Sequence, residues 1–248
     1  MAQPILIEIC VDSVASARAA ERGGAQRLEL CSDLLEGGIT PSLGLLEAVR
    51  AGISIPLHTI IRPRAGDFCY SDDEFEIMRR DIAFAKRAGA NGVVLGVLDL
   101  SGRVDIPRTR QLIELARPMS VTFHRAFDVS ADLHQSLEDV CVAGADRILT
   151  SGGEQDAMTG IDMIAKLVQS SRARISIMAG SGITAKTVPH ILERTGVREI
   201  HAGLATPVTN PILQRHGRVS LRKTRTQDHE RTQVLEQDVR QLKLATEI

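Results

Sequence analysis

Two short segments near the start of the chain carry a carboxylate and a thiol in the same order and at the same spacing. Glu8 precedes Cys10 in one segment, and Glu29 precedes Cys31 in the other, with one residue between the members of each pair. Soft thiolate ligands select Cu(I) over harder ions. Cys10 and Cys31, which are expected to end adjacent strands on the inward side, are therefore candidate ligands for Cu(I), although buried cysteines also serve as small apolar side chains.

An enzyme is the alternative interpretation of these segments. Glu8 and Glu29 on neighbouring strands, with His124 across from them, could share general acid and base catalysis or bind a hard divalent cation. Arg62 could orient an anionic substrate, or it could simply pair with Glu29. The candidate catalytic residues are Glu8, Glu29, His124 and Arg62.

Glycine-rich segments later in the chain are candidate binding loops for a small anionic metabolite, phosphorylated or carboxylated. Backbone N–H groups at a helix start bind phosphate, and the loops after the last two strands do so in many barrels. We expect the segment 179–184 to open such a helix. The candidate ligand-binding residues are Arg64, Ser151, Gly152, Gly180, Ser181, Gly182 and His201.

A repeated pattern indicates which elements position these residues. Four segments share a glycine, then Ala or Val, then two mostly polar or small residues and a strand pattern; they begin at Gly24, Gly89, Gly144 and Gly196. Glycine ends a helix at little cost because it accepts the left-handed conformation. The interval between successive repeats leaves room for two strand–helix units.

Four further strand patterns fill these intervals, at 5–10, 56–61, 120–127 and 176–180. Helical patterns, such as those at 133–143 and 161–169, alternate with the strands. Alternation predicts parallel strands, and eight of them predict closure. We therefore expect a single-domain (β/α)8 TIM barrel over residues 1–206, with an open doubly wound sheet as the alternative.

The last part of the chain, residues 207–248, is expected to be a C-terminal extension with an additional helix. Val234, Leu235, Val239 and Leu242 share one face of that helix. An apolar face of this kind packs against another element, here the barrel or a partner subunit. The basic segment 218–225 is expected to lie in solvent.

Local signals indicate where two of the barrel helices begin. Thr40 before Pro41 is typical of a cap followed by the first helical residue. Ser71 and Glu74 have the spacing of a capping box. We expect one helix to begin at each of these points.

Alternation along each strand divides its side chains between the barrel interior and the surrounding helices. The apolar residues form the outward set, and the inward set contains Glu8, Cys10, Glu29, Cys31, His58, Arg62, His124 and His201. Burying an unpaired charge costs several kcal/mol. These groups are therefore expected to pair with one another, hold an ion or meet a ligand. Asp128, after the fifth strand, is expected to order its loop or to pair with an arginine.

Composition and charge exclude several classes of function. The 248 residues have a formal net charge of −1, which gives no electrostatic footprint for nucleic acid. The apolar runs are shorter than the roughly 18 residues needed to span a membrane. We see no signal-peptide pattern, and the four scattered cysteines indicate free thiols, so we expect a cytoplasmic protein.

Several longer motifs are similar to those of one known family. They are Leu28–Cys31 with Glu36–Ser42, then Ile61–Ser71, Phe123–Asp128, Leu149–Gly152 and Ile177–Ile183. In this order they closely resemble the CutC family of copper homeostasis proteins, from about Ile5 to His201. Ala65 stands where that family usually has a second glycine, and His201-Ala202-Gly203 replaces a more usual His-Ser-Ser.

The resemblance implies a (β/α)8 barrel, a homodimer and a role in copper homeostasis, with Cu(I) binding described for some members. It implies no particular reaction. The expected partner is therefore a copper ion or a small anionic metabolite, and neither nucleic acid nor a membrane is expected.

Overall fold

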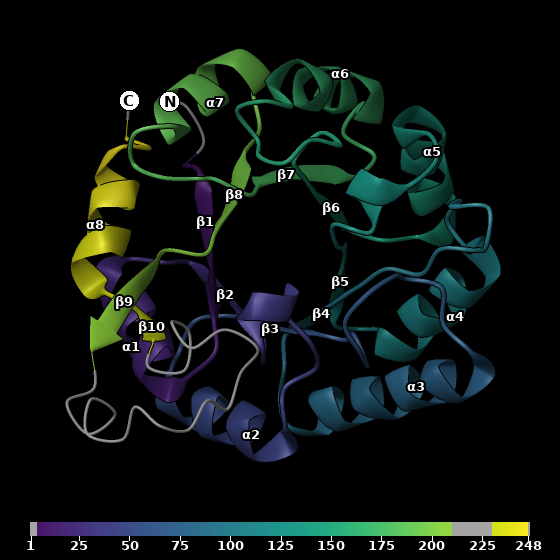
Figure 1. Ribbon diagram of the computed structural model, residues 1–248, viewed down its shortest axis with the longest axis horizontal. Coiled ribbons are helices and arrows are strands. Elements are labelled where there is room, and N and C mark those ends of the chain that lie inside the picture. The colour runs from purple at the N-terminus through teal and green to yellow at the C-terminus, as the bar shows by residue number, and fades with distance from the viewer. Residues whose placement is uncertain (1–3, 210–229, 248) are drawn as a thin grey trace, which may run out of the picture.

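The computed structural model, which describes residues 4–209 and 230–247, contains one closed barrel of eight parallel strands (Figure 1). Each strand pairs with the next along the chain, and the last pairs with the first. The strands are β1 (Leu6–Val11), β2 (Arg27–Leu30), β3 (Leu57–Ile60), β4 (Gly92–Leu95), β5 (Ser120–Phe123), β6 (Arg147–Thr150), β7 (Ser176–Gly180) and β8 (Glu199–Ala202). The predicted barrel is confirmed, and the open sheet is excluded.

Helices alternate with these strands and surround the barrel (Figure 1). They are α1 (Val14–Gly23), α2 (Leu43–Gly52), α3 (Asp72–Arg87), α4 (Ile106–Ala116), α5 (Leu133–Ala143), α6 (Ile161–Ser171), α7 (Val188–Thr195) and α8 (Glu236–Leu244). Within the described ranges, none of the helices combines the length and apolar character needed to cross a membrane.

The helix ends follow the local sequence signals at most positions. Gly24, Gly144 and Gly196 end their helices in the left-handed conformation, as predicted. The capping box of Ser71 and Glu74 at the start of α3 is confirmed. These caps satisfy backbone groups that the helix itself leaves without partners.

Two predicted helix starts are wrong. Helix α2 begins at Leu43, because Ser42 is its cap, and the Thr40 hydroxyl instead accepts the backbone N–H of Arg62 at 2.9 Å. Helix α7 begins at Val188, and the segment 179–184 leads into a turn rather than into the helix. In that turn the backbone N–H of Thr184 donates to the Thr187 hydroxyl.

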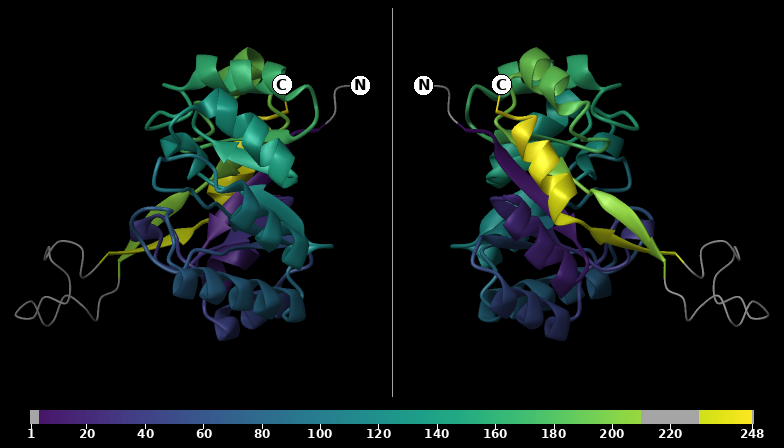
Figure 2. Two further views of the ribbon diagram at one scale, coloured as in Figure 1. Left: turned by 90° about the vertical axis from the view of Figure 1, so that its right-hand side faces the viewer. Right: turned by 90° about the vertical axis from the view of Figure 1, so that its left-hand side faces the viewer.

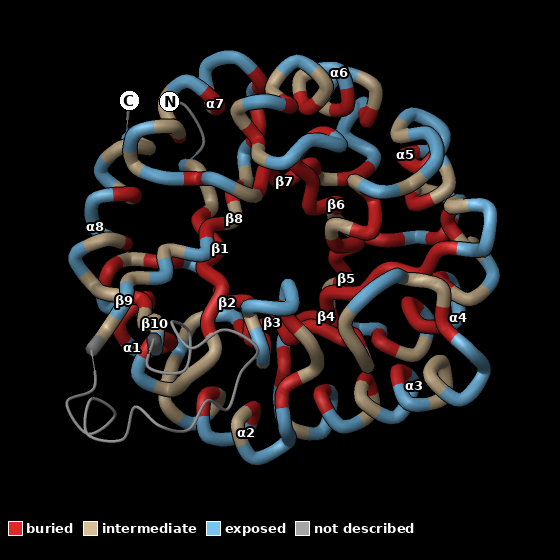
Figure 3. Tube along the Cα trace, viewed as in Figure 1, coloured by how far each residue is buried: buried red, intermediate tan, exposed pale blue. Residues whose placement is uncertain are grey.

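The apolar outward side chains of the strands form the core between barrel and helices. Ile9, Leu28 and Ile200 are fully buried there. The strands are buried along most of their length (Figure 3). The predicted inward side chains are also buried, apart from the partly exposed His201, and Glu8 has no exposed surface. The interior therefore combines an apolar outer layer with a polar, charged lumen.

An antiparallel pair of strands precedes the last helix and projects from the barrel (Figure 2). β9 (Ala205–Thr209) pairs with β10 (Glu230–Val234). The predicted basic segment 218–225 lies outside the described residues. Helix α8 packs on α1, where the backbone N–H of Val234 donates to Ser16 Oγ at 3.2 Å and Arg22 pairs with Glu236. The last helix therefore contacts the barrel of its own chain.

Candidate functional site

The two cysteines at the ends of β1 and β2 form a buried thiol pair. Cys10 Sγ lies 3.5 Å from Cys31 Sγ, and the side chains are 7% and 2% exposed. Ile60 and the half-buried Leu34 pack around them. Gly38, whose φ is +86°, lies so close that a Cβ there would be 3.2 Å from Cys31 Sγ. The loop after β2 therefore covers the thiols with backbone.

One imidazole links the two predicted carboxylates beside this pair. His201 Nδ1 lies 2.8 Å from Glu8 Oε1, and His201 Nε2 lies 3.5 Å from Glu29 Oε2. The histidine expected to face these carboxylates was His124, whereas the structure places His201 there. Alternation along β8 predicted that His201 points into the lumen. Alternation does not indicate which inward side chains contact one another.

The charges of this cluster displace the pKa values of its members. Burial would raise the pKa of Glu8, but Arg27 and His201 outweigh burial and lower it. Burial likewise raises the pKa of Glu29, to about 8, against the opposing charge of His201. Burial would lower the pKa of His201, yet its interactions with Cys10 and Glu8 raise it well above the usual value. A protonated His201 therefore lies between a carboxylate and a largely protonated Glu29.

A buried network of ion pairs lies below this cluster, and sequence reasoning missed it. Arg27 pairs with Glu8 and, at 2.7 Å, with Glu199, and Glu199 also pairs with Arg147. The signal was present, since Arg27, Arg147 and Glu199 continue the inward parity of their strands toward the amino ends. The network gives Glu8 and Glu199 the partners that buried charges need.

The thiol pair has the donor chemistry that Cu(I) requires. Its contact with Cys31 lowers the pKa of Cys10 to about 6, an effect that burial opposes and His201 reinforces. Two soft sulfur donors in a mostly apolar pocket fit Cu(I) better than a hard ion. Cys10, Cys31 and Glu29 place their ligand atoms within 4.8 Å of one another.

A second set of potential ligand atoms, on Glu8, Glu29 and His201, is equally compact. Two of these groups already bind each other, and Arg27 occupies another oxygen of Glu8. A hard cation here would have to displace these contacts. Of the two sets, the thiol pair is therefore the one whose ligand atoms are not already held by ion pairs.

Arg62 does not pair with Glu29. Its Nη1 donates to the carbonyls of Glu36 and Gly38 at 2.7 and 2.9 Å, and its Nη2 donates to the carbonyl of Gly66 at 3.0 Å. The side chain is 6% exposed. Arg62 therefore joins the loops after β2 and β3.

His124 and His58 are buried neutral imidazoles. The Nδ1 of His124 accepts the backbone N–H of Ala126 at 3.1 Å, and burial, with a smaller effect of Arg62, lowers its pKa to about 3. Burial also lowers the pKa of His58 to about 4, and its Nδ1 lies 3.9 Å from Glu8. His124 therefore contacts the loop after β3 rather than the carboxylates, since its ring lies 4.9 Å from that of Phe68.

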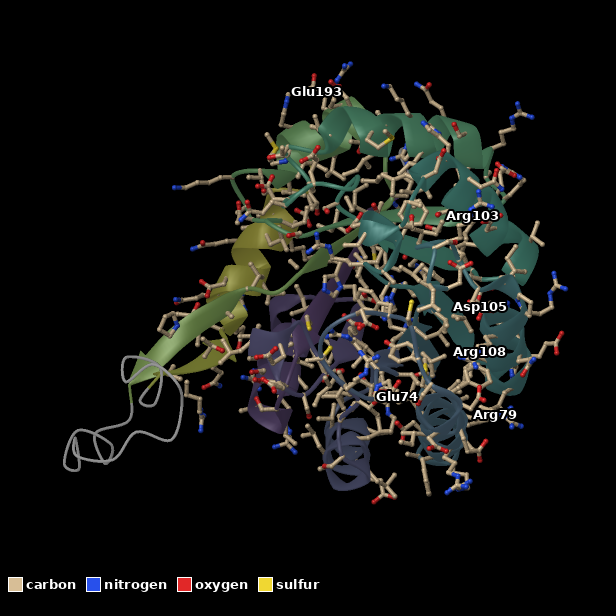
Figure 4. All side chains as sticks on the ribbon, turned by 45° about the vertical axis from the view of Figure 1, so that its right-hand side comes forward. Glu74, Arg79, Arg103, Asp105, Arg108 and Glu193 are labelled. Carbon is tan, nitrogen blue, oxygen red and sulfur yellow. The ribbon has the colours of Figure 1, made fainter. Side chains whose placement is uncertain are left out.

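Arg64 points away from the lumen toward the start of α3. It pairs with Glu74, which Figure 4 labels, and with Asp67, and its Nη2 donates to the carbonyl of Cys69 at 2.9 Å. These contacts fold the loop after β3 on itself. Arg64 therefore has carboxylate partners in its own loop and on α3.

The candidate binding loops after β6 and β7 contact each other. Ser181 Oγ donates to the carbonyl of Gln155 at 2.8 Å, and a Cβ on Gly182 would be 2.9 Å from Asp156 Cβ. Gly152 approaches Gly160, while Gly180 lies in register with His201 beside the cluster. Of this group, only Gly180 and His201 lie with the carboxylates and thiols.

Asp128 organises the loop after β6. Its carboxylate accepts the backbone N–H of Ser151 at 3.0 Å and that of Gly153 at 3.1 Å. It also pairs with Arg125 at 2.7 Å, and Arg125 Nη2 donates to Ser151 Oγ at 2.8 Å. As expected, Asp128 orders a loop and pairs with an arginine. It also holds Ser151 in place by accepting its backbone N–H.

Comparisons with known proteins point to one family. The CutC family model matches residues 5–206. A CutC family protein from Xanthomonas campestris pv. campestris strain B100 is 50% identical over 210 residues, covering 85% of this chain and 88% of that protein. The copper homeostasis protein cutC homolog of Mus musculus is 46% identical over 216 residues, covering 87% of this chain and 79% of the relative.

A solved structure agrees with this result. The crystal structure of CutC from Streptococcus agalactiae superposes with a TM-score of 0.76 at 33% identity, covering 80% of this chain and 98% of that one. The residues matched by the family model include the strands that carry the thiols, the carboxylates and His201. The chain therefore belongs to the CutC family.

Proposed function

We propose that this protein binds Cu(I) through Cys10 and Cys31 and that this binding is its part in copper homeostasis. The 3.5 Å contact between the two sulfur atoms carries the proposal, because one soft ion can reach both. The name of the mouse relative supports the same role.

The surroundings of the thiols favour a thiolate-bound ion. The lowered pKa of Cys10, about 6, means that this thiol is largely ionised at neutral pH. Two thiolates and one Cu(I) carry a net negative charge, and the protonated His201 beside Cys10 offsets it. Ile60 and Leu34 restrict the access of water.

Copper affinity can be measured by competition against a chromogenic Cu(I) chelator under anaerobic, reducing conditions. The Cys10→Ser/Cys31→Ser variant is expected to lose tight binding. The matched control is Cys69→Ser/Cys141→Ser, which removes the other two free thiols and should retain wild-type affinity. Unchanged affinity in the first variant, with its fold verified by circular dichroism, would refute the proposal.

We also propose that the protein acts in the cytoplasm. A thiol pair separated by 3.5 Å stays available for copper only where thiols are kept reduced. Fractionation of cells that express the tagged full-length chain would test this, and recovery in an oxidising compartment would contradict it.

A further inference from the structure

Arg62 is a buried cation that has no carboxylate partner among the described residues. Its hydrogen bonds run to three backbone carbonyls, which carry only partial charge. Its neighbour Arg64, although more exposed, pairs with both Glu74 and Asp67. A buried charge without a counter-ion is costly. Arg62 therefore lacks a carboxylate partner among the described residues, although the neighbouring Arg64 has two.

Two nitrogen atoms in this region are buried and have no hydrogen-bond partner within the described structure: Arg62 Nε and His124 Nε2. The first always carries a proton. The second carries one as well, because Nδ1 of the neutral ring accepts the backbone N–H of Ala126. Both atoms are therefore N–H donors that lack an acceptor, which folded proteins rarely tolerate.

The two side chains belong to the same part of the barrel mouth. They extend from the ends of β3 and β5, on either side of β4, where Gly96 has no side chain. A Cβ on Gly96 would be 2.6 Å from His124 Nδ1, so the imidazole occupies that space. The Phe68 ring contacts both groups, at 4.9 Å from the His124 ring and 5.2 Å from Arg62 Cζ.

We propose that Arg62 and His124 together bind one oxyanion, the carboxylate or phosphate group of a small molecule, at the barrel mouth. The oxyanion accepts the two N–H groups and balances the guanidinium charge. A neutral His124 suits this role, because it donates from Nε2 without adding a second positive charge. The site uses none of the atoms assigned to copper, so it does not depend on the proposed function.

The loops after β6 and β7 are less suited to an anion. The Asp156 side chain approaches Gly182, and the Ser181 hydroxyl already donates to a carbonyl. A carboxylate at that position repels an anion, whereas Arg62 attracts one. The geometry thus favours the ends of β3 and β5 as the anion site of this barrel.

The test is a titration of the full-length, metal-free chain with inorganic phosphate and, separately, with oxalate. The ring ¹⁵N signals of His124, assigned by comparison with His124→Asn, are followed in a long-range ¹H–¹⁵N spectrum. We expect a saturable shift with at least one anion. A response to phosphate would identify the ligand class as a phosphate ester, and a response to oxalate would identify it as a carboxylate.

Variants distinguish a built site from general charge attraction. Arg62→Met should weaken binding by roughly tenfold to hundredfold, the loss expected for a charge-assisted hydrogen bond. The control Arg103→Met removes an equal charge from an exposed position on the loop after β4 and should retain the wild-type affinity. The Cys10→Ser/Cys31→Ser variant should also bind the anion normally, which separates this proposal from the copper site.

Two results would overturn the proposal. The first is the absence of a saturable His124 shift with either anion in the wild-type chain, a measurement that needs no variant to fold. The second is an equal loss of affinity in Arg62→Met and Arg103→Met.

Discussion

Glu8 and His201 lie on the first and last strands of the barrel, and their side chains meet where those strands close it. The distance from His201 Nδ1 to Glu8 Oε1 is 2.8 Å, and the two residues are paired in the strand register. Glu8 also binds Arg27, so one fully buried carboxylate links the β1–β8 closure to the ion pairs below. The same carboxylate positions the imidazole beside Cys10.

Replacing Glu8 by glutamine should strongly destabilise the barrel. The change leaves the buried Arg27 without one of its charge partners and His201 beside a neutral amide. Breaking a buried ion pair in this way costs about 3–5 kcal/mol. Urea unfolding monitored by circular dichroism measures the loss. Glu236→Gln, which weakens the surface pairs with Arg22 and Arg240, is the control and should cost far less, because exposed ion pairs contribute little to stability; equal losses would show that the Glu8 network contributes little.

The barrel was predictable because its signals are local and repeated. The glycine pattern at Gly24, Gly144 and Gly196 marks helix ends, and strand alternation assigned Glu8, Cys10, Glu29 and Cys31 to the lumen. Neighbouring strands then had to bring the two cysteines together. The homodimer remains a prediction.

The pairing of charges inside the lumen was not predictable. Alternation fixes which side chains point inward, but the stagger of the strands decides their height, and the register aligns Cys10 with Glu29 rather than with Cys31. It also aligns Glu8 with His201, which no local pattern reveals. The hydrogen-bond partners of Arg62 are backbone carbonyls of two loops, and no pattern in the sequence indicates the conformation of those loops.

Adding a methyl group at Gly38 should weaken copper binding. In Gly38→Ala the new Cβ would lie 3.2 Å from Cys31 Sγ and 3.3 Å from Cys31 Cβ, which crowds the thiol. Gly37→Ala is the matched control, because its φ of +81° imposes a similar backbone cost but its Cβ contacts only Arg62. Chelator competition should show weaker Cu(I) binding in Gly38→Ala alone. The same affinity in both variants would argue against direct crowding of the site.

His124 should contribute to acid sensitivity. Its pKa is about 3 in the folded chain and about 6.5 when unfolded, so protons bind the unfolded state first as the pH falls. Its contribution is therefore complete above pH ~6.5 and declines toward pH ~3. His124→Asn keeps an acceptor for the Ala126 N–H, and its unfolding free energy should fall less steeply from pH ~6 to pH ~4, by at most about 1.4 kcal/mol per pH unit. His134→Asn, at an exposed position on α5, should retain the wild-type slope; a His124→Asn slope equal to it would contradict the assignment.

The packing of α8 on α1 can be tested by adding a methyl group between the two helices. In Gly23→Ala the new Cβ would lie 2.5 Å from Val239 Cβ and 2.7 Å from the Glu236 carbonyl, so the helices must move apart at a cost of about 1–3 kcal/mol. Gly44→Ala places a Cβ in open space on α2 and should not destabilise the chain, because alanine favours a helix. Urea unfolding of Gly23→Ala, Val239→Gly and the double variant completes the cycle. Because Val239→Gly removes the Cβ that the new methyl group would meet, the two losses should add to more than the loss in the double variant. Simple additivity would mean that α8 does not occupy this position on its own barrel.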